Sequence, residues 1–216
     1  MMIALFHWFV KITGFIPQLL IFRTQVFYED KSVQDRRIKG RAIVVSNHRK
    51  LLDFAVLTFV FWRRTLRCVV AEVMFQKNFV MTLLLRCLGA IHVDRNAFDF
   101  TFIGRCKRIL DKGGVVEIYP EARLPKKDEE LPLPFKPSAV YLALETDTPI
   151  IPIYHNGQHF SREHMRVMIG KPIMVRELYD ENLSQKENIE AINHYLRGKI
   201  IELREELEKI EQKDRA

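Results

Sequence analysis

The sequence predicts an α/β domain in which helices flank a predominantly parallel sheet, preceded by a short N-terminal helical element. Three observations predict this fold. The chain has 216 residues, of which 48% are apolar and 28% charged, enough for the core of one domain. Short runs rich in β-branched residues alternate with longer helical patterns, which is typical of parallel strands joined by helices. Residues 1–22 are strongly apolar, whereas residues 28–40 are polar.

The segment Met1–Phe22 predicts two short apolar helices at a membrane interface. Lys11, Gly14 and Pro17 interrupt the segment, and no apolar run reaches the ~20 residues that a spanning helix needs. A secretory signal is disfavoured, since no small-x-small cleavage site follows. Short apolar helices with nearby basic residues, Lys11 and Arg23, are typical of elements that lie in the interface with a basic side toward anionic headgroups. A core helix packed on the domain is the alternative.

Residues 28–40 predict a linker, and we place the domain boundary near residue 36. Residues 1–36 then form the membrane-binding element and residues 37–216 the α/β domain. Within this domain the β-branched runs predict strands at 41–46, 66–71, 90–93, 115–119, 150–154, 165–169 and 172–175.

Longer apolar patterns between these runs predict the helices. Gly113 and Gly114 suit the end of one helix, because glycine adopts the left-handed backbone that often follows helices. Apolar residues three or four apart in the last segment predict an amphipathic helix with a solvated charged face. The predicted helices are 51–62, 77–88, 98–112, 138–145 and 189–210.

Charge and cysteine content limit the function. The chain has 34 Lys and Arg against 27 Asp and Glu, a net charge of +7, which suits a partner rich in phosphate. A nucleic-acid-binding protein is one such class, but no recognition module for nucleic acid is present, so we expect an anionic membrane surface. The three cysteines show no metal-ligand spacing, so neither a disulfide framework nor a zinc site is expected.

A candidate catalytic pair follows the strand at 41–46. His48 stands five residues before Asp53. A carboxylate that accepts the proton of one ring nitrogen leaves the other nitrogen free to take a proton from an alcohol. Five residues along one helix would leave the two side chains about 140° apart, so the pair requires a turn between them. A surface histidine beside an Asp53 that caps a helix is the alternative.

Two further clusters follow predicted strands. Arg95 comes just after the strand at 90–93, and Glu121 and Arg123 follow the strand at 115–119. Ligands of open α/β sheets bind beyond the carboxyl ends of the strands, so these residues are expected on one rim with His48. Arginine suits phosphate because its guanidinium offers paired donors, and Glu121 could orient an arginine or accept from a substrate hydroxyl. Ordinary ion pairing within loops is the alternative.

Four ordered blocks resemble the glycerolipid acyltransferase family, the 1-acyl-glycerol-3-phosphate acyltransferases and their lysophospholipid relatives. They are NHRKLLD at 47–53, GAIHVDR at 89–95, YPEAR at 119–123 and PIIPIY at 149–154. The resemblance covers about residues 40–175, and four blocks in order are far more specific than one.

The resemblance implies an enzyme at the cytoplasmic face of a membrane, monotopic or peripheral. It would move a fatty acyl chain from acyl-CoA or acyl carrier protein, as co-substrate without other cofactor, to a lysophospholipid hydroxyl, with 1-acyl-glycerol-3-phosphate as the expected acceptor. It implies His48 as general base and Asp53 as its orienter, with no acyl-enzyme. The residues implied in substrate binding are Gly89, Arg95, Glu121 and Arg123.

The chain departs from the family pattern at two positions. Ala122 stands where the family usually has glycine, and Lys50 where it often has serine. These departures leave the predicted pair intact, but they bear on the acceptor and make an inactive membrane-binding relative an alternative. His155, His159 and His164 are not expected to bind metal, because Asn156-Gly157 predicts a turn instead of the helix that such a site needs.

Overall fold

Strand β2, Ala42–Ser46, lies at the centre of the sheet and carries a core on each face. Successive strand side chains point to opposite faces. Ile43 and Val45 belong to one buried cluster, while Ala42 and Val44 belong to the other. A strand that is apolar on both faces requires cover on both faces, as in parallel sheets flanked by helices.

The computed structural model describes residues 2–94, 101–161 and 163–215. The strands are β1 Gln25–Tyr28, β2, β3 Leu66–Ala71, β4 Ile91–Val93, β5 Val115–Ile118, β6 Ile150–His155 and β7 Arg166–Ile169. The helices are α1 Met2–Thr13, α2 Phe15–Ile21, α3 Asp53–Val60, α4 Glu72–Phe75, α5 Phe79–Cys87, α6 Thr101–Leu110, α7 Ser138–Thr146, the 3-10 helix η1 Val175–Leu178 and α8 Gln185–Arg215.

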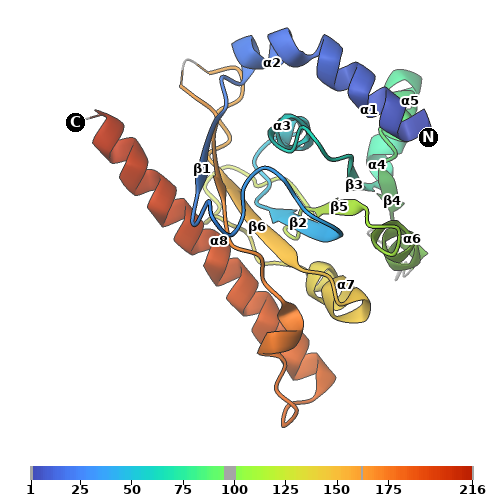
Figure 1. Cartoon of the computed structure of the whole chain (residues 1–216), viewed down its shortest axis with the longest axis vertical. Helices are drawn as coiled ribbons and strands as arrows, with labels where there is room; N and C mark the ends of the chain where they lie inside the picture. The colour runs from blue at the N-terminus through green and yellow to red at the C-terminus, as the bar shows by residue number, and fades with distance from the viewer. Residues whose placement is uncertain (1, 95–100, 162, 216) are drawn as a thin grey trace.

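The seven strands form one sheet in the order β1-β7-β6-β2-β5-β3-β4 (Figure 1). Among the described strands, only β6 and β7 pair antiparallel; the other neighbours are parallel. The predicted class, a predominantly parallel sheet flanked by helices, is therefore confirmed.

Two details of the sheet differ from the prediction. Residues 25–28 form strand β1, which pairs with β7 at the sheet edge, so a strand of the sheet lies ahead of residue 36. The expected strand at 172–175 is wrong. Only Ile173 pairs, in an isolated bridge with Ile150, and the chain then forms η1, because Pro172 lacks the N–H that a ladder needs.

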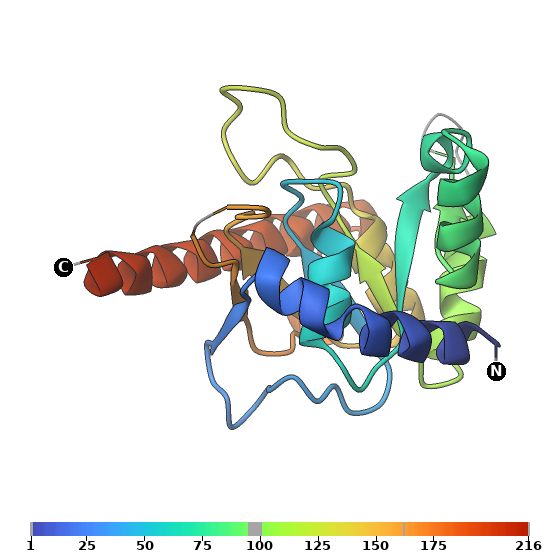
Figure 2. The same ribbon diagram turned by 90° about the horizontal axis from the view of Figure 1, so that it is seen from above.

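The helices form two layers around the sheet (Figures 1 and 2). Helix α3 covers one face, with α1 and α2 outside it, whereas α6, α7 and α8 pack on the other. Helix α8 is longer than predicted. It begins with a capping box in which the Ser184 backbone N–H donates to the Glu187 carboxylate at 2.9 Å and the Glu187 N–H donates to the Ser184 hydroxyl oxygen at 3.3 Å.

Two buried polar side chains fasten α1 to the domain. Lys11 is 2% exposed, and its ammonium donates to the carbonyls of Trp62 at 2.7 Å and Arg64 at 2.6 Å, just after α3. The His7 ring donates to the Leu88 carbonyl, at the end of α5, at 2.9 Å. Burial lowers the pKa of Lys11 to about 8. The expectation that Lys11 faces anionic headgroups is therefore wrong, because Lys11 pairs with the last carbonyls of a helix end.

The opposite side of α1 and α2 is apolar and exposed. The side chains more than half exposed there are Met2, Leu5, Phe9, Ile12, Ile16 and Leu20. None of the described helices is by itself long and apolar enough to cross a bilayer. The pair α1 and α2, bent by 56°, reaches the required length and composition only when taken together.

Candidate active site

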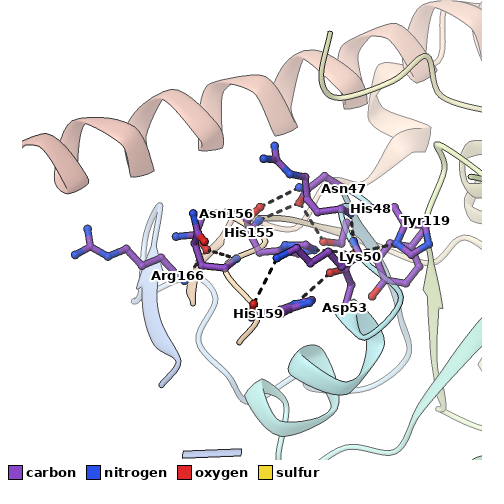
Figure 3. A network of polar contacts seen from close by, with 12 residues as sticks. Asn47, His48, Lys50, Asp53, Tyr119, His155, Asn156, His159 and Arg166 are labelled. Carbon is purple, nitrogen blue, oxygen red and sulfur yellow. Dashed lines mark hydrogen bonds and ion pairs between the residues drawn. The ribbon is translucent and has the colours of Figure 1, made fainter. Parts of the chain in front are cut away.

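Three adjacent strands end at the same edge of the sheet. Strand β2 lies between β5 and β6 and is parallel to both, so the residues after β2, β5 and β6 meet there. Figure 2 shows the loops after β2 and β5 standing on one side of the molecule. Polar side chains from all three strand ends gather at this edge (Figure 3).

The structure brings His48 and Asp53 together. The Nδ1 atom of His48 lies 2.8 Å from Oδ2 of Asp53, a hydrogen-bond distance, while the His48 side chain remains 16% exposed and Asp53 is fully buried. With Nδ1–H donating to the carboxylate, Nε2 keeps a lone pair for a proton from a substrate. The pair therefore has the geometry of a general base and its orienter.

A tight turn makes this contact possible. The chain leaves β2 at Ser46 and helix α3 begins at Asp53, so the two residues do not share a helix. The Asp53 Oδ2 atom also accepts from the backbone N–H groups of Arg49 at 2.7 Å and Lys50 at 2.9 Å. The carboxylate thus holds the turn and the imidazole at once.

Two further histidines approach the Asp53 carboxylate from β6 and the loop after it. The Nε2 atom of His159 lies 3.3 Å from Oδ1, and Nε2 of His155 lies 3.7 Å from Oδ2. Burial alone would raise the pKa of Asp53, but His155, the hydrogen bond from His48 and the Lys50 N–H outweigh it and lower the pKa. Asp53 is therefore ionised at neutral pH.

Glu121 is buried beneath the turn that carries His48. One carboxylate oxygen accepts from the His48 backbone N–H at 2.8 Å, and the other accepts from the Leu133 N–H at 2.9 Å. Burial is the largest influence on this carboxyl and raises its pKa. In the structure Glu121 fixes the backbone of His48, and contact with a substrate hydroxyl stays a prediction.

The other predicted site residues lie in different places. Arg123 is on the same edge but pairs with Glu129, with both guanidinium nitrogens 2.7 Å from its carboxylate. Gly89 precedes β4 and so lies at the amino end of that strand, where its carbonyl accepts from Arg67. The structure therefore does not bring Gly89 to His48. Arg95 lies outside the described residues.

Ala122 has a backbone φ of 58°, in the left-handed region that favours glycine. The structure thus explains why glycine suits this position of the third block. Alanine keeps the same turn at the cost of backbone strain.

An apolar pocket of about 280 Å³ opens beside His48. It runs between α3, β3 and the helices α4 and α5, and Leu52, Phe54, Cys68, Val70, Leu85 and Tyr119 are among the residues that line it. A separate small cavity of about 10 Å³ lies next to it; the two share Cys68 and Val70 in their linings, and His7 of α1 and Glu117 also line the small cavity. An apolar chain that enters beside His48 would therefore lie against α3, β3, α4 and α5.

Tyr119 forms one wall of the His48 site. The two rings are tilted by 30° with their centres 4.5 Å apart, and the Tyr119 hydroxyl donates to Glu117 at 2.5 Å. Burial raises the pKa of Glu117 to about 8, so this carboxyl is largely protonated at neutral pH.

Sequence reasoning missed Tyr119, His155 and His159 as parts of the site. His155 ends strand β6, so the rule that ligands bind beyond strand carboxyl ends could have indicated it. His159 had no such signal, because its approach to Asp53 depends on how the following loop folds back. Among the described residues no group of three or more potential ligands could hold a metal ion.

Comparisons with known proteins show the family of the chain. The family model described as Acyltransferase matches residues 25–156. The chain is 29% identical over 116 residues to the human 1-acyl-sn-glycerol-3-phosphate acyltransferase beta, covering 53% of this chain and 41% of that protein. It is 26% identical over 158 residues to the 1-acyl-sn-glycerol-3-phosphate acyltransferase of Cocos nucifera, covering 72% of this chain and 50% of that protein. The chain thus spans half or less of these relatives.

The crystal structure of the 1-acyl-sn-glycerophosphate (LPA) acyltransferase PlsC from Thermotoga maritima has the same fold. The TM-score is 0.60 at 16% identity, over 94% of this chain and 95% of that one. The family model spans more than half of the sequence and includes the His48–Asp53 turn and the ends of β5 and β6. From these matches we conclude, as the four blocks predict, that the chain belongs to the acyltransferase family.

Proposed function

We propose that the protein transfers a fatty acyl group from a thioester to the free hydroxyl of 1-acyl-glycerol-3-phosphate, giving phosphatidic acid. The observation that carries this proposal is the 2.8 Å contact between His48 Nδ1 and Asp53 Oδ2 at the mouth of an apolar pocket. The names of the two curated relatives support the acceptor. The thioester donor is acyl-CoA or an acylated acyl carrier protein.

Catalysis needs no covalent enzyme intermediate. His48 Nε2 takes the proton of the acceptor hydroxyl while the oxygen attacks the thioester carbonyl. The C–O bond forms, the C–S bond breaks, and the protonated imidazole returns its proton to the departing thiolate. Asp53 stays ionised throughout and stabilises the imidazolium.

The apolar pocket suits the acyl chain of the donor. His48 stands at its opening, so a chain buried along Phe54, Cys68 and Val70 would leave its carbonyl beside the base. Burial of each methylene contributes about 0.8 kcal/mol, which favours a long chain over a short one until the cavity ends. The pocket floor then limits chain length.

The exposed apolar side of α1 and α2 supports a position of the enzyme at a membrane surface. Both substrates carry acyl chains that partition into bilayers, so an interfacial position supplies them at high local concentration. Nine large apolar side chains of these helices are exposed, from Met2 to Leu20. Anchoring by this face, without a spanning helix, is the monotopic arrangement.

Thiol release tests the proposal. Purified enzyme in detergent is given palmitoyl-CoA or palmitoyl carrier protein, with and without 1-acyl-glycerol-3-phosphate, and the thiol is measured. We expect release that depends on the acceptor, together with phosphatidic acid as product. His48→Ala should reduce kcat at least about 100-fold, because the general base is lost.

Matched variants separate catalysis from folding. Asp53→Asn keeps the shape of the side chain but lacks the charge that stabilises the imidazolium, so kcat should fall while KM changes little. His164→Ala removes a histidine that bonds to Arg23 outside the site and should leave kcat unchanged. Equal activity of wild type and His48→Ala would contradict the mechanism, and release without any acceptor would indicate a thioesterase.

A further inference from the structure

The two oxygens of the Asp53 carboxylate are used unequally. Oδ2 accepts from His48 Nδ1, from the Arg49 N–H and from the Lys50 N–H. Oδ1 is buried and has no hydrogen bond among the described residues. Leaving a buried carboxylate oxygen without a donor is unfavourable, because its hydration is lost and not replaced, so a donor for Oδ1 would stabilise the site.

His159 is the side chain placed to supply that donor (Figure 3). Its Nε2 atom lies 3.3 Å from Asp53 Oδ1 and likewise has no other hydrogen-bond partner among the described residues. The side chain is 1% exposed, and its ring packs between those of Phe22, at 5.5 Å, and His155, at 6.4 Å. A small rotation of this confined ring aligns Nε2–H with Oδ1.

His159 in its neutral form has one N–H group to donate. Burial lowers its pKa, although Asp53 opposes the shift, so the ring is neutral at neutral pH. A neutral imidazole carries one N–H, and placing it on Nε2 satisfies both unpartnered atoms. His155 is a poorer donor, because its Nε2 lies 3.7 Å from Oδ2, an oxygen that already accepts three hydrogen bonds.

We propose that His159 is a positioning residue for acyl transfer, which donates Nε2–H to Asp53 Oδ1 and extends the His48–Asp53 pair into a buried His48–Asp53–His159 relay. The donor fixes the plane of the carboxylate so that Oδ2 faces His48 Nδ1. It also withdraws charge from the carboxylate, and so limits how strongly Asp53 holds a protonated His48. This role in catalysis rests on the proposed function, whereas the contact itself does not.

Several charged or titratable groups share this environment and must be kept constant in a test. Those that face Asp53 or His48 from the packed elements are Arg49 and Lys50 on the turn, Cys68 on β3, Glu117, Tyr119 and Glu121 on or after β5, and His155 on β6. Substituting only His159 leaves all of them in place.

Two substitutions separate the donor from the ring. His159→Phe keeps an aromatic ring between Phe22 and His155 but has no N–H. His159→Gln loses the ring but keeps a side-chain N–H donor. If donation to Oδ1 is the role, the phenylalanine variant loses it and the glutamine variant retains part of it. Thermal unfolding of both variants verifies that they fold.

The first readout is the pH dependence of kcat/KM. Without the donor, Asp53 keeps more charge and stabilises protonated His48. The acid limb of the profile should therefore move to higher pH by about half a unit or more in His159→Phe. The kcat should fall about tenfold with KM unchanged, and His159→Gln should lie nearer to wild type. A residue that only packs would change stability without moving the acid limb.

The second readout is independent of activity. Diethyl pyrocarbonate modifies neutral imidazoles, and mass spectrometry gives the fraction of His48 modified at each pH. We expect the midpoint for His48 to rise in His159→Phe and to stay near wild type in His159→Gln. Equal midpoints in all three proteins, or equal shifts in both variants, would overturn the relay. If wild type transfers no acyl group, the proposed function fails, yet these midpoints still decide whether His159 acts on Asp53.

Discussion

Asn47 and His155 exchange two hydrogen bonds across the ends of two strands. The Asn47 side-chain amide donates to the His155 carbonyl, and the His155 N–H donates to the Asn47 side-chain oxygen, each at 2.9 Å. The Asn47 side chain thus continues the β2–β6 pairing beyond Ser46. It thereby holds the residue before the proposed base against the end of β6.

Removing the Asn47 amide should loosen the site. Asn47→Ala leaves the buried N–H and carbonyl of His155 unpaired, which should lower the free energy of unfolding by about 2 kcal/mol. The kcat should fall more than KM rises, because His48 loses its support. Urea unfolding and steady-state kinetics measure both, and Asn182→Ala on an exposed turn is the control, with an expected change within about 0.5 kcal/mol.

Glycine at position 122 should stabilise the protein. Ala122 has φ 58°, which is unfavourable for a residue with a Cβ, and glycine removes this strain. We expect Ala122→Gly to raise the free energy of unfolding by about 0.5–1 kcal/mol, after allowing for the greater freedom of glycine in the unfolded chain. Ala4→Gly, on the exposed side of helix α1, should destabilise instead. Destabilisation by Ala122→Gly would show that the methyl group packs favourably.

Stability should depend on pH through Glu117. Its pKa is raised to about 8 from an ordinary 4.5, so the folded state binds one more proton than the unfolded state between these values. The associated stabilisation is complete below the ordinary pKa and is lost as the pH rises through about 8. Glu117→Gln should flatten the fall of the melting temperature between pH ~5 and ~9. The same slope in both proteins would contradict this assignment.

Filling the pocket should shorten the preferred acyl chain. Cys68 lines both the pocket beside His48 and the small cavity next to it, so Cys68→Phe places a ring in the pocket. The ratio of kcat/KM for palmitoyl to decanoyl donors should fall about tenfold. Cys87→Phe introduces the same ring at a cysteine on α5 outside the pocket lining and should leave the ratio unchanged. A loss of activity with all chain lengths would not fit this role.

The outer face of α1 and α2 should carry membrane binding. Ile12→Asp combined with Ile16→Asp places two charges on the exposed apolar side and should abolish co-sedimentation with vesicles of phosphatidylethanolamine and phosphatidylglycerol. The melting temperature should change little.

Lys11→Met is the control that should change stability but not membrane binding. It leaves the carbonyls after α3 without their buried donor, and should lower stability by about 3 kcal/mol while the apolar face persists.

The sequence predicts the central sheet well and its edges poorly. Strands such as β2 and β5 are β-branched runs buried on both faces, and this pattern is visible in the residues themselves. Strand β1 has four residues of intermediate burial, and only its pairing with β7 makes it a strand. A short edge strand has no such pattern to distinguish it from a loop.

The candidate site, too, has parts that the sequence predicts and parts that it does not. The contact between His48 and Asp53 could be predicted from their spacing and an assumed turn, because the two residues are only five positions apart in the sequence. Sequence position placed Glu121 on the same rim, but it did not reveal that backbone N–H groups occupy both carboxylate oxygens. The approach of His159 to Asp53 joins segments far apart in the chain. Such contacts depend on packing, which local patterns do not encode.

His7 lines a small cavity next to the pocket beside His48, and it belongs to the helix α1 whose outer side is apolar and exposed. Deleting residues 2–13 to make a more soluble enzyme would therefore remove part of the lining of the small cavity as well as the exposed face. The truncated protein should accept longer acyl chains and also admit water. Its preference among acyl-chain lengths should therefore weaken, even in detergent. Helix α1 thus contributes both to the exposed apolar face and to the lining of the small cavity.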